Sequence, residues 1–197
     1  LAELCATSDA TPRPVMLLTC GELRVVPATV HIPLKKVPGS LTQELIVETV
    51  EITVHGLRGS FGISTPRIAV TGLNPHAGED GTLGREEIEM IAPAIETLQA
   101  KGLDVDGPLS ADAVFQERTR NQYDAIIAMY HDQALIPIKA LAFDSTVNVT
   151  LGLPIIRTSP DHGTAYELAG SGKANPGSLI ESLKLAAALA TRRMGAA

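Results

Sequence analysis

The chain has 197 residues, of which 45% are apolar and 19% charged, so it can bury a substantial core and is not a disordered polypeptide. Its net charge of −6 argues against sequence-independent nucleic-acid binding, because such binding needs a basic face that displaces counterions from phosphates. Cys5 and Cys20 form no metal-ligand pattern, and we find neither a signal peptide nor an apolar run long enough to span a bilayer. We therefore expect a cytoplasmic globular protein that binds neither nucleic acid nor membrane.

Apolar, β-branched runs alternate with helical patterns along the chain. Residues 15–19 and 23–30 flank a Cys-Gly-Glu turn and predict a hairpin. Ser40 is expected to cap a helix over residues 41–57. The later elements are expected in this order: a strand over 68–73, a helix over about 85–101 that Gly102 ends, a short helix over 111–117, a strand over 124–129, an unassigned segment over 131–142, strands over 147–151 and 155–157, and a last helix over about 177–193. This alternation predicts an α/β three-layer sandwich with a mixed, largely parallel sheet.

Three of the five histidines, His31, His76 and His131, follow predicted strands. Ligands bind outside the carboxyl ends of strands in open α/β sheets, so these imidazoles are expected to converge on one site. Three imidazoles leave an open position on a divalent ion, as catalytic metal sites do. The alternative for each is a hydrogen-bonded histidine at a strand end. His55 lies inside a helical pattern, where a surface or capping role is expected.

Lys139, Asn148 and Arg157 form a second group of polar residues in an otherwise apolar stretch. A guanidinium and an ammonium on neighbouring strand ends would clamp a phosphate or carboxylate, with Arg offering paired donors and Lys a point charge. The alternative is that these cations form ion pairs with carboxylates of the chain, namely Asp132, Asp144 or Asp161.

A glycine-rich stretch follows, over residues 161–165 and 169–178. Small residues let a backbone approach a ligand closely, and free amides near a helix start can receive a phosphate or an adenine edge. Flexibility near a chain terminus is the alternative explanation for such a loop. The chain contains no Rossmann fingerprint.

Several ordered motifs together resemble a known family. They are Leu73-Asn74-Pro75-His76-Ala77-Gly78-Glu79, Gly107-Pro108 with Ala111-Asp112, Met129-Tyr130-His131-Asp132-Gln133, the segment from Val147 to Ser159, and Asp161-His162-Gly163-Thr164-Ala165. The resemblance is to the 4-hydroxythreonine-4-phosphate dehydrogenase (PdxA) family of vitamin B6 biosynthesis, and it runs from Leu1 nearly to the end. It implies the fold of the isocitrate and isopropylmalate dehydrogenases.

The resemblance also implies a set of site residues. His31, His76 and His131 match the ligands of a divalent metal (Zn, Mg or Co), at a site shared by the two subunits of a homodimer. Lys139, Asn148 and Arg157 match substrate-binding positions for a small phosphorylated substrate, and Lys139 or Asp132 is a candidate general base. The expected contacts with the adenosine part of NAD or NADP are made by His162, Gly163, Thr164, Ala165 and Asn175.

The implied reaction is oxidation of the 3-hydroxyl of 4-phosphooxy-L-threonine, followed by loss of carbon dioxide. The alternatives are a related dehydrogenase acting on phospho-threonate, phospho-erythronate or a dihydrodiol carboxylate, and a non-catalytic metal- and anion-binding fragment. Residues 1–158 are expected to form the metal- and substrate-binding domain, and residues 159–197 to belong to a second domain.

One difference from the family pattern concerns the start of the chain. Leu1 replaces an initiator methionine, and full family members carry a further N-terminal segment that includes a substrate-binding His-Thr pair. We therefore expect this polypeptide to bind metal but to turn over poorly. Ala134 in place of the usual glycine is expected to matter little.

Overall fold

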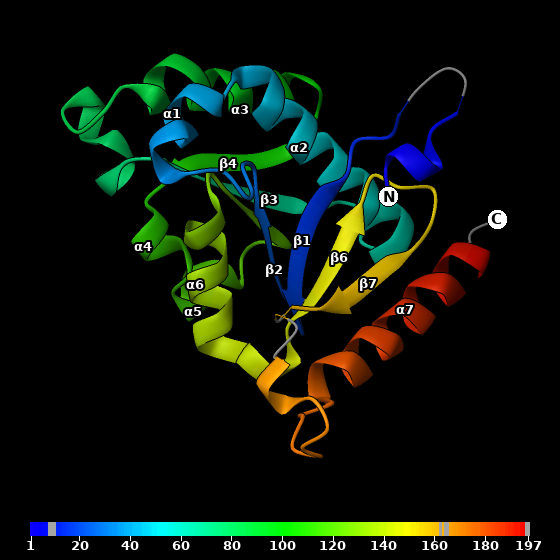
Figure 1. Ribbon diagram of the computed structural model, residues 1–197. Helices are drawn as coiled ribbons and strands as arrows, with labels where there is room; N and C mark the ends of the chain where they lie inside the picture. Colours follow the sequence, from blue (N-terminus) through cyan, green and yellow to red (C-terminus); the bar gives the residue numbers. More distant parts are fainter. Residues whose placement is uncertain (8–10, 162, 164–165, 196–197) are drawn as a thin grey trace.

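A seven-stranded mixed sheet forms the centre of the chain (Figure 1), whose computed structural model describes residues 1–7, 11–161, 163 and 166–195. The strand order is β4-β3-β5-β2-β1-β6-β7. Strands β2, β5, β3 and β4 pair in parallel, whereas β1 is antiparallel to both of its neighbours and β7 is antiparallel to β6. The strands are β1 (Val15–Cys20), β2 (Leu23–Pro27), β3 (Arg67–Thr71), β4 (Asp104–Leu109), β5 (Ala125–Ala128), β6 (Val147–Leu151) and β7 (Arg157–Pro160). The predicted mixed, largely parallel sheet is confirmed.

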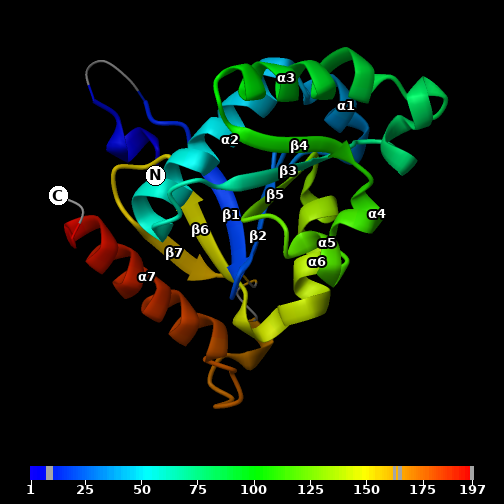
Figure 2. The same cartoon turned by 180° about the vertical axis from the view of Figure 1, so that it is seen from behind.

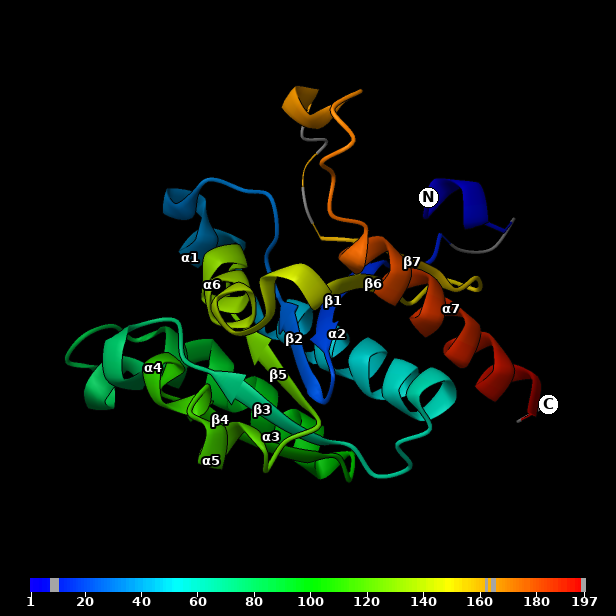
Figure 3. The same ribbon diagram turned by 90° about the horizontal axis from the view of Figure 1, so that it is seen from below.

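Helices cover both faces of this sheet (Figures 1 and 2). The α-helices are α1 (Val37–Ser40), α2 (Gln43–Gly56), α3 (Ala92–Ala100), α4 (Ala111–Val114), α5 (Glu117–Arg120), α6 (His131–Ala142) and α7 (Gly177–Gly195). Short 3-10 or π turns are η1 (Glu3–Cys5), η2 (Leu34–Lys36), η3 (Leu57–Phe61), η4 (Pro75–Gly81), η5 (Glu87–Ile91), η6 (Phe143–Ser145) and η7 (Tyr166–Leu168). Helix α7 packs along β6 and β7 at one edge of the sheet (Figure 3). Within the described residues, no helix combines the length and apolar character needed to cross a membrane.

Alternation of side chains along the strands divides the core into two layers. Leu17 and Val26 face the core beneath α2 and α3, whereas Leu18 and Val25 face the smaller core beneath α6. All four side chains are fully buried. Complete burial of a Val or Leu side chain contributes about 1.5–3 kcal/mol, so the hairpin of β1 and β2 anchors both layers.

The start of α2 differs from the sequence prediction. Thr42 is its N-cap, with extended backbone angles and a side-chain oxygen that accepts the Leu45 N–H at 3.1 Å. Ser40 instead ends α1, so the prediction that Ser40 caps the helix is wrong. The reason is that the residues just before the predicted helix form a separate single turn, α1, which begins at Val37-Pro38 and ends at Ser40.

Other boundaries also differ from the prediction. The predicted helix over 85–101 is a π turn (η5) continued by α3, and the predicted helix over 111–117 is two single turns, α4 and α5. The strand expected over 155–157 begins only at Arg157. Strand β4 was not predicted, because Asp104, Asp106, Gly107 and Pro108 interrupt its apolar pattern.

Two glycines occupy backbone conformations with positive φ for different reasons. Gly152 has φ 78°, and a Cβ there would lie 2.1 Å from the Arg13 carbonyl oxygen. Gly102 has φ 77° just beyond α3, where a Cβ would meet no atom within 4 Å. Conformation alone therefore favours glycine at 102, as predicted, while close packing also requires it at 152.

Candidate active site

The parallel pairing of β2 and β5 brings two of the predicted metal ligands together. Beyond the end of β2, the Ala28 N–H donates to the Ala128 carbonyl at 2.7 Å, and the Thr29 hydroxyl donates to the Met129 carbonyl at 2.8 Å. The segments that follow β2 and β5 therefore run side by side beyond the strand ends. His31 and His131 then lie with their ring centroids 5.3 Å apart and their planes tilted by 47°.

His131 opens α6, and its ring is held by its neighbour. The His131 Nδ1 atom lies 2.7 Å from an Asp132 carboxylate oxygen. In the tautomer that carries the proton on Nδ1, this nitrogen donates to Asp132 and the Nε2 lone pair is left for an electrophile. Asp132, a candidate general base from the sequence, is thus placed to orient the His131 imidazole.

Gln133 joins the ends of β3 and β5. Its Oε1 atom accepts the Met129 N–H at 2.7 Å and the Thr71 hydroxyl at 2.9 Å. Its Nε2 atom donates to the Gly72 carbonyl at 2.9 Å. All three partner residues are buried, so Gln133 satisfies polar groups that water does not reach and holds the first turn of α6 against the sheet.

A cleft of about 320 Å³ lies beside His31 and is lined by two guanidinium groups. Arg157 begins β7, and its Nη1 atom lies 3.4 Å from both the Asn148 Oδ1 and Thr150 Oγ1 atoms of the neighbouring strand β6. Hydrogen bonds of this length are weak, so the guanidinium keeps donor capacity for an anion. The second guanidinium, that of Arg13, is paired with Glu48.

Lys139 lies elsewhere. It projects from α6, not from a strand end, so that part of the prediction is wrong. Its ammonium lies 3.3 Å from an Asp161 carboxylate oxygen and donates to the Asp161 carbonyl at 3.2 Å. Lys139 does not line the cleft that contains Arg157. The ion pair with Asp161, the alternative drawn from the sequence, is therefore what the structure contains.

His76 lies in η4, on the loop after β3. Five consecutive residues, from His76 to Asp80, have φ between 44° and 82°. Such left-handed backbone costs roughly 1–2 kcal/mol for each non-glycine residue. Across the described residues, no three His, Cys, Asp or Glu side chains come close enough to hold a metal ion. Within this chain His76 does not meet the other two histidines, because η4 carries it to a separate hollow with Asp80 and Pro108, and the expected site shared by two subunits stays a prediction.

The loop that carries His76 is anchored by a residue that was not predicted to belong to the site. Glu87 is only 3% exposed and accepts the backbone N–H groups of Leu73 and Asn74 at 2.8 and 2.7 Å. Position 87 lies four residues before Ile91 and eleven before Leu98, two fully buried residues of the same helical face. An acidic residue that has the same spacing as the buried apolar residues of a helical face was the sequence signal that could have identified Glu87.

A second cleft, of about 960 Å³, lies between η6, the glycine-rich loop and the start of α7. Gly163 and Asn175 line it together with the rings of Phe143 and Tyr166. The Asn175 Oδ1 atom accepts the Gly177 N–H at 2.9 Å, which orders the entry to α7. The other predicted cofactor residues, His162, Thr164 and Ala165, lie outside the described residues.

Comparison with known proteins identifies the family of the chain. The family model described as "Pyridoxal phosphate biosynthetic protein PdxA" matches residues 1–186. The chain belongs to the PdxA family. Among similar PdxA relatives named 4-hydroxythreonine-4-phosphate dehydrogenase, that of Bradyrhizobium diazoefficiens is 58% identical over 98% of this chain and 56% of its own length. The relative from Roseobacter denitrificans is also 58% identical, over 97% of this chain and 59% of its own length. The chain thus spans less than two thirds of these PdxA relatives.

Solved structures agree with the family assignment. A crystal structure of 4-hydroxythreonine-4-phosphate dehydrogenase from Klebsiella pneumoniae matches with a TM-score of 0.84 and 44% identity, covering 96% of this chain and 56% of that one. A terephthalate 1,2-cis-dihydrodiol dehydrogenase from Burkholderia xenovorans matches with a TM-score of 0.72 and 32% identity, covering 89% and 55%. The predicted isocitrate dehydrogenase-like fold, which PdxA dehydrogenases share, is confirmed.

Proposed function

We propose that the protein carrying this chain is an NAD(P)- and metal-dependent 4-hydroxythreonine-4-phosphate dehydrogenase. The observation that carries the proposal is the juxtaposition of the His31–His131 pair with the cleft of Arg157 and Asn148. This arrangement offers imidazole ligands next to an anion-binding guanidinium. A phosphorylated hydroxy acid is a substrate that would use both.

The proposed reaction has two steps. The carbon that bears the 3-hydroxyl of 4-phosphooxy-L-threonine gives a hydride to NAD(P)+, and the hydroxyl gives its proton to a base, so that 2-amino-3-oxo-4-phosphobutanoate and NAD(P)H form. This β-keto acid then exchanges its carboxylate for a proton as carbon dioxide leaves, which gives 3-amino-2-oxopropyl phosphate. The product belongs to pyridoxal phosphate biosynthesis.

Several side chains of this chain have roles in the proposal. Arg157 and Asn148 hold an anionic substrate group and so orient the reacting carbon. Asp132 keeps the His131 ring in position through its contact with Nδ1. Lys139 is paired with Asp161, so a role as base or substrate ligand requires that this pair open when substrate binds.

The donor set of the paired histidines fits a divalent ion. Two imidazoles with nearby rings supply two ligands, and imidazole favours Zn or Co over Mg. The third ligand in this proposal is His76 of the partner subunit, so the functional unit is a homodimer. A bound ion would supply Lewis-acid polarisation of the substrate oxygen. Gly163 and Asn175, which line the larger cleft, would hold the adenosine part of NAD or NADP.

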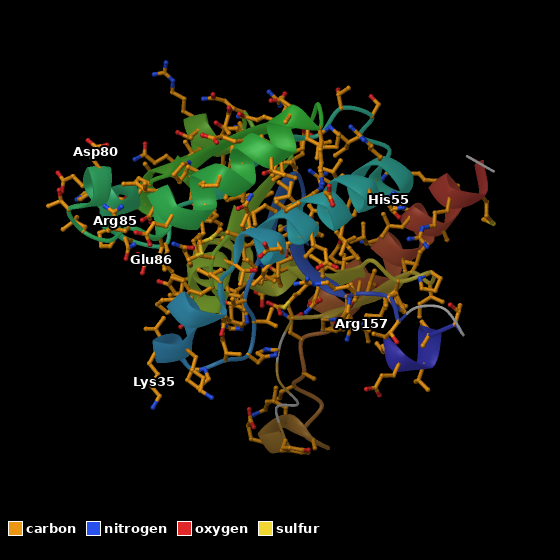
Figure 4. The ribbon with its side chains drawn as sticks, turned by 90° about the horizontal axis from the view of Figure 1, so that it is seen from above. Lys35, His55, Asp80, Arg85, Glu86 and Arg157 are labelled. Carbon is orange, nitrogen blue, oxygen red and sulfur yellow. The ribbon has the colours of Figure 1, made fainter. Side chains whose placement is uncertain are left out.

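Zinc titration and substrate turnover test the proposal. His31→Ala, His76→Ala and His131→Ala variants of the chain should each weaken zinc binding, while His55→Ala on α2 should not (Figure 4 labels His55). In a protein that carries this chain and has the length of the PdxA relatives, 4-phosphooxy-L-threonine should drive NAD(P)+ reduction. Unchanged zinc affinity in all three histidine variants would contradict the proposed metal site, and absence of turnover by that longer protein would contradict the proposed dehydrogenase activity in favour of a non-catalytic metal- and anion-binding protein.

A second candidate has its own support in the similarity to the Burkholderia xenovorans terephthalate 1,2-cis-dihydrodiol dehydrogenase. An unphosphorylated dihydrodiol carboxylate could also place its carboxylate against Arg157. Phospho-threonate and phospho-erythronate are further candidates with the same chemistry. Comparing kcat/KM for these substrates separates the candidates, because a pocket built for phosphate should favour phosphorylated substrates over the dihydrodiol.

A further inference from the structure

We infer that Glu87 is a positioning residue for His76, acting through the backbone on both sides of it. The inference rests on the proposed role of His76 as a metal ligand. Glu87 does not contact the metal site in this account. It determines where the loop presents the imidazole.

The first support is the bonding of the Glu87 carboxylate. Its Oε1 atom accepts the Leu73 and Asn74 N–H groups, and its Oε2 atom accepts the Asn74 side-chain amide at 3.0 Å. None of the ion pairs among the described residues involves Glu87. A carboxylate this deeply buried is expensive unless hydrogen-bonded, so these amides and Glu87 hold one another in place.

The second support is packing on the far side of His76. Gly78 has φ 82°, and a Cβ there would lie 2.5 Å from Glu87 Oε2. At Gly72 a Cβ would lie 3.0 Å from Glu87 Oε1. The carboxylate therefore touches the chain four residues before His76 and two residues after it. Both ends of the segment that carries the imidazole meet one side chain.

The third support is the conformation of the segment itself. His76 and the four residues after it all have left-handed backbone, and only Gly78 among them is glycine. Such a run does not persist without surrounding structure that determines it. Glu86 adds one bond to the Asn74 amide at 2.7 Å, and it lies with Asp80 and Arg85 at the same end of the molecule (Figure 4). The buried partner in this arrangement is Glu87.

Cobalt and zinc titrations of the chain test the inference. Glu87→Gln keeps the side-chain size but replaces Oε2, the acceptor for the Asn74 amide, with a donor. We expect a roughly 10–100-fold loss of metal affinity, the usual effect of changing a group that supports a ligand, together with an altered visible spectrum of bound cobalt. Glu89→Gln is the matched control, because Glu89 lies on the same turn but is exposed and pairs with Arg85.

A double-mutant cycle separates positioning from general stability. If Glu87 acts through His76, then Glu87→Gln should cost no further affinity in a His76→Ala background. Gly78→Ala, which pushes on the same carboxylate from the other side, should reproduce the loss in a chain whose circular dichroism shows it folded. The inference about Glu87 is overturned by an equal loss of metal affinity in both backgrounds, or by no loss from Glu87→Gln while His76→Ala weakens binding. Neither result affects the proposed role of His76. No loss from His76→Ala overturns the proposed metal role of His76 as well.

Discussion

Replacing Gln133 with alanine tests whether the junction of β3, β5 and α6 depends on one amide. The substitution removes three hydrogen bonds and leaves the Met129 N–H and the Gly72 carbonyl without their side-chain partner in a buried setting. The Thr71 hydroxyl also loses its acceptor, but it can rotate.

The expected cost follows from these groups. Leaving one buried donor or acceptor unsatisfied costs about 1–3 kcal/mol, and the cost is smaller for an unsatisfied carbonyl than for an unsatisfied N–H. We therefore expect Gln133→Ala to lower the free energy of unfolding by about 3 kcal/mol, a large share of the roughly 5–15 kcal/mol typical of a domain.

Urea unfolding followed by circular dichroism measures this loss. Gln122→Ala is the control, because Gln122 is exposed and donates one bond to the Arg118 carbonyl, so its change should stay within about 0.5 kcal/mol. A loss for Gln133→Ala below about 1 kcal/mol, or no larger than that of the control, would refute the reasoning.

Three further predictions concern stability. Thr42→Ala should cost about 1 kcal/mol by removing the α2 cap, whereas Ser40→Ala should change the urea midpoint little. Gly152→Ala should prevent folding or lower the thermal midpoint far more than Gly102→Ala, because only the former meets backbone. Burial, aided by the hydrogen bond to a carboxylate, raises the pKa of Tyr123. Its contribution to stability is therefore complete below the unfolded pKa of about 10 and lost as pH rises through the folded value. Ultraviolet titration should show that Tyr123→Phe removes a late-ionising phenol, and the variant should lose less stability at alkaline pH.

The periodicity of apolar residues in the sequence predicted most of the helices and strands. The hairpin around Gly21, the strand after Val147 and the last helix all lie where their patterns placed them. The misplaced boundaries arose where local turns compete, as at Ser40, or where Gly and Pro break an otherwise regular strand, as in β4. Such boundaries depend on contacts with distant parts of the chain, which a local pattern does not record.

The candidate site was predictable only in part. His31 and His131 follow β2 and β5, and these adjacent parallel strands end at the same edge of the sheet. Their positions in the sequence therefore predicted that the two rings lie together. The same argument does not bring His76 to them within one chain, because its loop has left-handed backbone, and it is wrong for Lys139, which lies on α6 and not at a strand end. Asn148 and Arg157 meet because the consecutive strands β6 and β7 pair in antiparallel fashion, and residue types alone do not give the register of that pairing.

The central place of the β1–β2 hairpin has a consequence for how the chain folds. Its two strands precede β5 and β6 in the sequence, and their outer edges pair with these later strands. The hydrogen bond between Thr29 and Met129 joins residues 100 positions apart. Such high contact order slows folding. Until the later strands arrive, a nascent chain exposes two apolar strand edges, so self-association during synthesis is the hazard that this topology creates.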